Sequence, residues 1–276
     1  MKLYKTADAV LVESNNKYYS IKGQDWQSFI NDDNLFQKVE SMLKGLPEVD
    51  SIDEKITLAP IGDQQELWAC GVTYLRSKIG RQEESQVAGG ADFYSKVYDA
   101  ERPEVFFKAT PHRVTGHLGK VRIRKDSTWD VPEPELTLVV SSSGKIVGYT
   151  VGNDMSSRSI EGENPLYLPQ AKTYDGCAAL GPCILVAEQP LDAGTIITLA
   201  IKRNDELKFE GTVAIGQMKR QQNELVSFVF RECSFPYGCL IMTGTGIVPG
   251  HDFTLQSGDI IYITIDQVGT LVNTVE

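Results

Sequence analysis

Short apolar runs bounded by turn-forming residues dominate this chain from about residue 120 onward. These runs, bounded by Gly, Pro and Asp, predict strands at 121–124, 136–140, 146–151, 183–186, 196–202, 208–215, 225–230 and 260–265. Two earlier runs, at 67–72 and 105–107, predict further buried strands. Because long helical patterns do not separate the strands, the sequence predicts a β-rich α+β fold rather than a parallel βαβ fold.

The first 60 residues have a different pattern. Apolar residues recur at helical spacing across Asp25–Lys44, which predicts two short helices broken at Asp32–Asn34 beside short strand-like runs. The stretch from Pro47 to Pro60 is typical of a linker. We therefore expect a small N-terminal α+β region at residues 1–60 and a larger domain that carries the chemistry at residues 61–276.

One pair of predicted strands reads as a hairpin. Leu136–Val140 and Ile146–Val151 are apolar and β-branched, and Ser141–Lys145 between them is typical of a tight turn. Centring the turn on Ser143 and Gly144 gives an antiparallel register. A slip of one residue would turn every side chain to the opposite face of the hairpin.

In this register three acidic residues share one face of the hairpin. Glu133 lies directly opposite Asp154, and Glu135 lies two residues further along the same face. Like charges that face each other destabilise a strand pair, and converging carboxylates are the preferred ligands of hard divalent cations. The trio therefore predicts a metal site. The alternative is three solvated acids at strand ends, in a chain that has 37 acidic residues.

Composition excludes some classes of function. With 276 residues and 41% hydrophobic content, the chain is long enough for a large core. It has 27 basic and 37 acidic residues, a net charge of −10, and no basic cluster interleaved with aromatics, so no nucleic acid partner is expected. No apolar stretch approaches the roughly 20 residues of a membrane helix, and the N-terminus has no secretory signal pattern. We expect no membrane partner.

The cysteines indicate a reducing compartment. Their number is odd and none form a C-x-x-C pair; they are Cys70, Cys177, Cys183, Cys233 and Cys239. Their spacing matches none of the usual zinc patterns. We therefore expect buried free thiols and a cytoplasmic protein.

A series of motifs follows in a fixed order over roughly residues 68–275. The motifs are Pro132-Glu133-Pro134-Glu135-Leu136, the run from Gly148 to Arg158, the run from Lys172 to Gly176 leading to Leu180-Gly181-Pro182, Thr243-Gly244-Thr245-Gly246, the run from Leu255 to Asp259, and the run from Gly269 to Asn273. Together they resemble the fumarylacetoacetate hydrolase superfamily. The resemblance implies a mixed β-sandwich roll and a homodimer or higher homo-oligomer.

The resemblance also implies a metal-dependent chemistry. Members of the superfamily hold Mg²⁺, sometimes Ca²⁺ or Mn²⁺, through carboxylates that match Glu133, Glu135 and Asp154. Their substrates are small anionic 2-oxo acids, which chelate the metal. Lys172 matches the family lysine beside the metal. The resemblance thus points to the same three carboxylates as the hairpin.

One segment departs from the hydrolases of the superfamily. They carry an Asn-Tyr-x-x-His-x-x-Glu-like segment whose histidine activates water, whereas here residues 71–78 place Ser77 at the histidine position and Thr73 at the asparagine position. A serine cannot act as a base near neutral pH as imidazole does. The segment, continuing through Gly80–Ser85, is similar to that of the 2-keto-3-deoxy sugar-acid dehydratases.

The dehydratase branch implies roles for individual residues. A base removes a C3 proton of the metal-chelated 2-oxo acid, and an acid protonates the departing 4-hydroxyl. We expect Lys172 as the base, because burial near a metal disfavours its ammonium form. Glu84 is the expected acid, with Glu83 as second choice, and Arg81 would bind substrate. Residues 77–90 are expected to close as a lid.

Three further residues are expected to bind substrate: Ser77, and Lys108 and Thr245, which match pocket positions of the family. The alternative for Lys108 is a lysine that snorkels out of the core, and for Thr245 a tight turn between glycines. Three other functions stay open: a hydrolase of acylpyruvates or fumarylacetoacetate-like diketones with a relocated base, a decarboxylase or keto–enol isomerase, and a metal-stabilised binding protein without activity.

Overall fold

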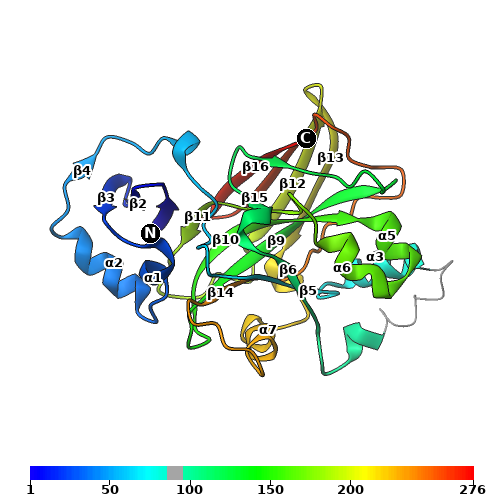
Figure 1. Ribbon diagram of the computed structural model, residues 1–276, viewed down its shortest axis with the longest axis horizontal. Helices are drawn as coiled ribbons and strands as arrows, with labels where there is room; N and C mark the ends of the chain where they lie inside the picture. Colours follow the sequence, from blue (N-terminus) through cyan, green and yellow to red (C-terminus); the bar gives the residue numbers. More distant parts are fainter. Residues whose placement is uncertain (86–95) are drawn as a thin grey trace.

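The computed structural model describes residues 1–85 and 96–276, without the side chains of residues 82–85 (Figure 1). Its strands form two mixed sheets. The larger sheet has the order β4 (Glu48–Val49), β3 (Lys17–Lys22), β2 (Ala9–Ser14), β1 (Lys2–Lys5), β11 (Ala178–Leu185), β10 (Ile146–Ser157), β9 (Asp130–Val140), β14 (Cys239–Met242), β5 (Leu67–Gly71) and β6 (Glu104–Ala109), with β7 (Val114–Thr115) beside β11. The smaller sheet has the order β13 (Glu206–Ala214), β12 (Ile196–Arg203), β15 (Ile260–Ile265), β16 (Gly269–Val275) and β8 (Lys120–Val121).

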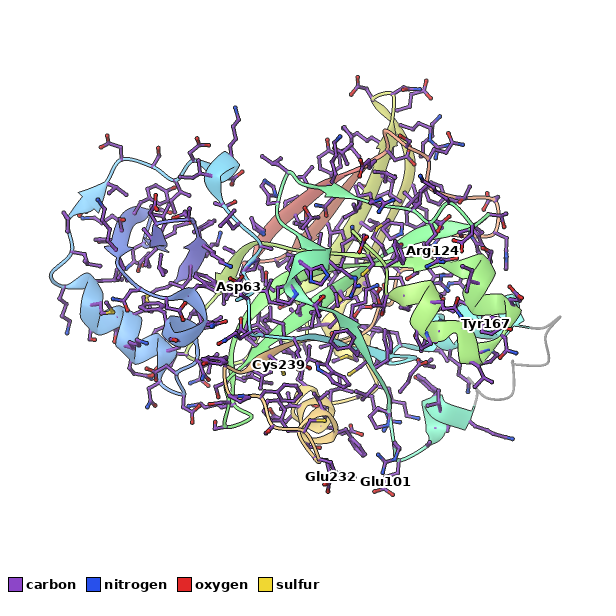
Figure 2. The ribbon with its side chains drawn as sticks, in the orientation of Figure 1. Asp63, Glu101, Arg124, Tyr167, Glu232 and Cys239 are labelled. Carbon is purple, nitrogen blue, oxygen red and sulfur yellow. The ribbon has the colours of Figure 1, made fainter. Side chains whose placement is uncertain are left out.

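Helices cover the ends of the larger sheet. The α-helices are α1 (Trp26–Ile30), α2 (Leu35–Leu43), α3 (Leu75–Ser85), α5 (Arg158–Glu163), α6 (Leu168–Lys172) and α7 (Gln222–Val229), and the short 3-10 helices are η1 (Glu54–Ile56), η2 (Pro111–Arg113), η3 (Pro165–Tyr167) and η4 (Ile215–Gln217). Helices α3, α5 and α6 gather at the end of the molecule away from the N-terminal region (Figure 1). Arg124 is bonded to this group of helices, because it donates to the carbonyl of Gln170 in α6 at 3.1 Å (Figure 2).

The two sheets pack face to face. Leu136 and Leu138 of β9 share one apolar core with Leu199 of β12 and Ile263 of β15. Cys239, at the start of β14, is buried in the same core (Figure 2). This arrangement is a β-sandwich, in which the inner faces of both sheets supply the core. The predicted fold class, a β-rich α+β protein with a mixed β-sandwich roll, is confirmed.

The N-terminal region adds strands to the larger sheet. Strand β1 pairs with β11, so that Leu3 lies opposite Ile184, and β2, β3 and β4 follow outward. Helices α1 and α2 pack on this part of the sheet and are separated between residues 30 and 35, as predicted. The Asp25 side chain caps α1 by accepting from the Ser28 amide at 3.0 Å. The predicted linker contains β4 and η1, and the domain boundary at residue 60 stays a prediction.

The hairpin register is the one predicted from the sequence. Glu133 pairs with Asp154 and Glu135 with Gly152. A bulge between Ile146 and Gly148 shifts the register nearer the turn, and the turn itself closes through the bond from the Gly144 amide to the Ser141 carbonyl at 3.0 Å. The pleat therefore holds the three carboxylates on one face throughout the part of the hairpin that matters for the site.

Two predicted strands differ from the structure: only Val121 of the run at 121–124 is in a strand, β8, and the run at 225–230 is helical. Residues 225–230 lie mainly in helix α7, which begins with a capping box between Gln221 and Glu224. The helix buries Leu225, Val226 and Val229 against the apolar core. A short apolar run fits either period, and here the cap and the packing decide for the helix.

The cysteines and the lengths of the helices bear on two further predictions. All five cysteines are free thiols, four of them buried and Cys233 exposed. In the part of the chain that the structure describes, no helix has both the length and the apolar character needed to cross a membrane.

Candidate active site

The three predicted metal ligands come together in the interior. Glu133 and Glu135 of β9 and Asp154 of β10 are all buried, and one carboxylate oxygen of each lies within 4.8 Å of the other two. The alternative of solvated acids is therefore wrong. The charges around these carboxylates indicate whether the site suits a metal ion.

The charges around the trio compensate its carboxylates unequally. Burial alone would raise the pKa of Glu133, but the charges of Lys172, Arg158 and Arg81 lower it to about 2. By contrast, burial together with Asp154 and Glu133 raises the pKa of Glu135 well above its usual range. A divalent cation bound among the three oxygens would remove this cost, so the donor set and its electrostatics fit Mg²⁺.

Lys172, at the end of α6, lies against the trio. Its Nζ is 2.6 Å from Glu133 Oε2, 3.1 Å from Asp154 Oδ2 and 2.6 Å from Ser156 Oγ. Burial lowers the pKa of Lys172, but Asp154 and Glu133 raise it by more, so the net shift is upward. Without a metal the two carboxylates favour its ammonium form, and the expectation that this form is disfavoured beside a bound metal stays a prediction.

Lys108 of β6 is buried on the other side of Asp154. Its Nζ lies 2.6 Å from Asp154 Oδ1 and donates to the Met155 carbonyl at 3.0 Å and to the Lys172 carbonyl. The snorkelling alternative is wrong, since the side chain is fully buried. These three partners match the three donors of an ammonium group. The geometry therefore favours a role in holding Asp154 and the end of α6 over direct binding of substrate.

Helix α3 brings two of the predicted substrate-binding residues to the site. Ser77 and Arg81, one turn apart, are both buried. Ser77 Oγ donates to the Tyr74 carbonyl at 2.7 Å and accepts from the Tyr74 amide at 3.2 Å, so its hydroxyl serves the start of the helix. Arg81 Nη1 lies 2.5 Å from Glu161 Oε1.

A small closed cavity connects these groups. It measures about 10 Å³, and its lining includes the trio, Lys172, Ser77, Arg81, Arg158, Phe106, Gly71, Val72, Gly244 and Thr245. This is room for about one water molecule or ion. Thr245 Oγ1 bonds both backbone groups of Ile247, which is the tight-turn alternative realised at the cavity wall. Entry of a substrate requires some lining side chains to move.

The predicted acid lies at the edge of the described region. The backbone of Glu84 is in the last turn of α3, but its side chain and that of Glu83 lie outside the described part of the structure, as do residues 86–90 of the proposed lid at residues 77–90. The assignment of Glu84 stays a prediction.

Two acids, the buried Glu161 and the partly buried Glu104, were not singled out from the sequence. Glu161 of α5 lies 2.5 Å from Arg81 and 3.9 Å from both Lys172 Nζ and Arg158 Nε. Its spacing from Arg158, three residues on one helix face, is a usable sequence signal. Together these contacts make Glu161 the anion that three cations of the site share.

Glu104, the first residue of β6, lies over Gly71. A Cβ atom on Gly71 would stand 1.8 Å from Glu104 Oε2, so only glycine leaves room for this carboxyl group. Oε2 is buried without a hydrogen-bond partner among the described residues. Burial raises the pKa of Glu104, while the charge of Arg81 opposes that rise. A raised pKa favours the protonated form of this carboxyl group, which is the form that can donate a proton.

Fold and site agree with the relationships of the sequence. Residues 80–276 match the family described as fumarylacetoacetate (FAA) hydrolase C-terminal. The chain belongs to this family.

Individual relatives show which enzymes of this family the chain is similar to. The chain is 48% identical over 227 residues to a "Probable 2-keto-3-deoxyxylonate dehydratase" of Haloferax volcanii, an alignment that covers 82% of this chain and 77% of the relative. It is 45% identical over 217 residues to the "2-dehydro-3-deoxy-D-arabinonate dehydratase" of Saccharolobus solfataricus, covering 78% and 72%. Among solved structures, a 2-keto-3-deoxy-D-arabinonate dehydratase complexed with magnesium and 2,5-dioxopentanoate is similar with a TM-score of 0.84 and 36% identity, covering 100% of this chain and 99% of the other.

Proposed function

We propose that this protein is a Mg²⁺-dependent dehydratase of a five-carbon 2-keto-3-deoxy sugar acid, a carbon–oxygen lyase. The observation that carries the proposal is the buried trio Glu133, Glu135 and Asp154 beside Lys172, in a pocket whose histidine position is Ser77. Relatives at 45–48% identity are named as dehydratases of this substrate class. The carboxylates could also hold Ca²⁺ or Mn²⁺, whose oxygen-donor preferences overlap.

The names of the two relatives point to one kind of substrate. Xylonate and arabinonate of the same series differ at C2 and C3. Oxidation of C2 to a ketone and loss of the C3 hydroxyl remove both differences, which leaves C4 as the stereocentre that the enzyme must read. The proposed substrate is therefore 2-keto-3-deoxy-D-pentonate, and the proposed product is 2,5-dioxopentanoate, the molecule bound in the similar solved structure.

The reaction needs proton transfers at neighbouring carbons. Loss of the C3 proton and of the C4 hydroxyl gives water and a C3–C4 double bond. Hydrogen then moves from C5 and its hydroxyl to C4 and C3, which leaves an aldehyde at C5 without any external oxidant. Mg²⁺, when bound, supplies a Lewis acid that chelates the carboxylate and 2-oxo oxygens and makes the C3 hydrogens acidic.

Lys172 is the proposed base at C3. Its Nζ lies within 3.1 Å of oxygens of both Glu133 and Asp154, so it is adjacent to the place where the 2-oxo head must bind. With the charges of these carboxylates compensated, burial remains as the main influence on the pKa of Lys172. Burial disfavours the ammonium form and so favours the neutral amine that a base requires.

Glu104 and Glu84 are the two candidates for the acid that protonates the C4 hydroxyl. Glu104 is supported by its position, because its carboxyl group lies over Gly71, which lines the cavity, and burial raises its pKa. Arg81, paired with Glu161, is the proposed donor to a substrate oxygen. Comparing Glu104→Gln with Glu84→Gln separates the two acids, since only the true acid should lose most of kcat.

A hydrolase remains the second candidate, and the histidines weigh against it. None of the three lines the cavity. His112 is exposed, His117 accepts from the Val272 amide at 3.2 Å, and His251 stacks on Trp129 with ring centroids 4.6 Å apart. Water activation for carbon–carbon cleavage would therefore need a base other than imidazole.

We further propose a cytoplasmic homodimer or higher homo-oligomer. Five free cysteines among the described residues are typical of a reducing compartment. Light scattering of the purified protein measures the oligomeric state directly, and a monomer would contradict this part of the proposal.

The test of the function is a substrate panel with and without EDTA. We expect the purified protein to convert 2-keto-3-deoxy-D-pentonate to 2,5-dioxopentanoate, followed by an aldehyde dehydrogenase that reduces NADP⁺. EDTA should abolish turnover and Mg²⁺ should restore it. Release of pyruvate from acylpyruvates, with no aldehyde formed from the pentonate, would favour the hydrolase instead.

A further inference from the structure

Two loops at the ends of parallel strands interlock beside the proposed metal site. Strand β14 lies between β9 and β5, antiparallel to the former and parallel to the latter. The chain leaves β5 at Gly71 and leaves β14 at Met242. The residues that follow, Thr73 and Thr243–Gly244, meet there: Thr73 Oγ1 donates to the Thr243 carbonyl at 2.7 Å, with both groups buried.

A left-handed backbone at Val72 directs Thr73 into this contact. Val72 has φ of +53° and is buried, although β-branched residues rarely adopt this conformation. Gly244 has φ of +93°, and a Cβ there would stand 2.1 Å from Thr73 Oγ1 and 2.8 Å from the Cys70 carbonyl oxygen. The two loops are therefore shaped to each other.

The peptide group between Thr243 and Gly244 also reaches a metal ligand. The Gly244 amide donates to Glu135 Oε2 at 2.6 Å. The carbonyl that accepts from Thr73 and the amide that donates to Glu135 belong to one planar trans peptide unit, in which C=O and N–H point in opposite directions. Thr73 therefore bonds the carbonyl at one end of this rigid peptide unit, and the amide at its other end bonds Glu135.

We propose that Thr73 is a positioning residue for metal binding, acting through the 243–244 peptide on Glu135. The bond to the carbonyl fixes the rotation of the peptide and polarises its N–H, which strengthens the bond to the carboxylate. Thr243 also donates to the Leu136 carbonyl, from its amide at 3.0 Å and from its hydroxyl at 2.9 Å. These bonds keep the 243–244 peptide beside β9. Thr73 itself does not touch the substrate or the metal.

The proposal rests on the proposed metal site, and its test measures metal affinity rather than turnover. Thr73→Val removes the hydroxyl and keeps the shape, Thr73→Ser keeps the hydroxyl, and Thr73→Ala covers the case in which the valine variant does not fold. The matched control is Thr195→Val, because Thr195 is buried and its hydroxyl has no partner within the described residues. Mn²⁺ serves as the probe, followed by electron paramagnetic resonance and calorimetry of the full chain.

Loss of a group that orients a metal ligand commonly weakens metal affinity by about 10–100-fold. We expect Mn²⁺ affinity to fall about tenfold in Thr73→Val and Thr73→Ala. Thr73→Ser should stay within about twofold of wild type, and Thr195→Val should be unchanged. Wild-type affinity in folded Thr73→Val or Thr73→Ala, or an equal loss in Thr195→Val, would overturn the inference alone. A wild-type protein that binds no Mn²⁺ or Mg²⁺ would overturn the proposed function together with this inference.

Discussion

The two faces of the β9–β10 hairpin are both buried, yet they hold opposite kinds of side chain. One face places Leu136, Leu138 and Val151 in the apolar core between the sheets. The other face places Glu133, Glu135 and Asp154 in a closed pocket of charges. Burial alone therefore does not separate core from active site. The distinction lies in what each buried group finds around it, apolar side chains on one face and compensating charges on the other.

The largest effect is expected on the charged face. Asp154→Asn should lower kcat/KM by about 10³-fold, because it removes one ligand charge and leaves Lys172 and Lys108 with less compensation. Steady-state kinetics and Mn²⁺ binding measure the change. A variant with wild-type turnover would show that the trio does not hold the catalytic metal.

The apolar face should respond in stability instead. Leu138→Ala empties part of a fully buried site and should cost about 2–5 kcal/mol of unfolding free energy, measured by urea denaturation. Its kcat in the folded protein should stay near wild type. The control is Leu207→Ala at an exposed position, where the expected change is within about 0.5 kcal/mol.

A smaller effect is expected where charge positions a cation. Glu161→Gln removes the anion that lies 2.5 Å from Arg81, so Arg81 should lose its fixed place at the cavity. We expect KM for the pentonate to rise about tenfold, a loss of about 1.4 kcal/mol, with a smaller change in kcat. Glu224→Gln, which breaks the partly exposed pair with Arg220, is the control and should leave KM unchanged.

A separate effect, on stability rather than on turnover, concerns a buried acid that is not part of the site. Burial raises the pKa of Asp130, at the start of β9, to about 6. An unfolded aspartate titrates near pH 4, so the folded state binds more protons between about pH 4 and 6 and stability falls as pH rises through this window. Asp130→Asn should therefore be more stable than wild type at pH 8, with the difference vanishing near pH 4. Urea denaturation at both pH values measures it, with exposed Asp252→Asn as a control that should show no such trend.

The metal face could be predicted from the sequence because its determinants are local. Strand alternation and one turn fix the register that brings Glu133, Glu135 and Asp154 together. Strand alternation does not find Glu104 and Glu161, because the packing of β6 and α5 brings them beside the site; only the i, i+3 spacing of Glu161 from Arg158 is a sequence signal. The upward shift in the pKa of Lys172 without a metal could not be predicted either, because it depends on the distances to two carboxylates, which no pattern of residues gives.

Two other features were not predicted from the sequence, for physical reasons. The 225–230 run is predicted as a strand because a short apolar run fits both the strand period and the helical period. The capping box at Gln221 and Glu224 is the sequence signal that indicates the helix. The resemblance places Lys108 in the substrate pocket, and the structure adds an ion pair with Asp154 and hydrogen bonds to two backbone carbonyls that the sequence does not indicate. Residue identity gave its neighbourhood correctly but not the direction of its bonds.

The pairing of β1 with β11 has a consequence for how the chain folds. The Met1 ammonium donates to the Val186 carbonyl at 3.1 Å across a separation of 185 residues. During synthesis the first strand therefore waits for a partner that emerges from the ribosome much later, and such long-range pairings are slow to form. Until then β1 presents an unpaired edge, the kind of surface on which nascent chains aggregate. Co-translational folding should therefore depend on protection of the free edge of β1 until β11 has been made.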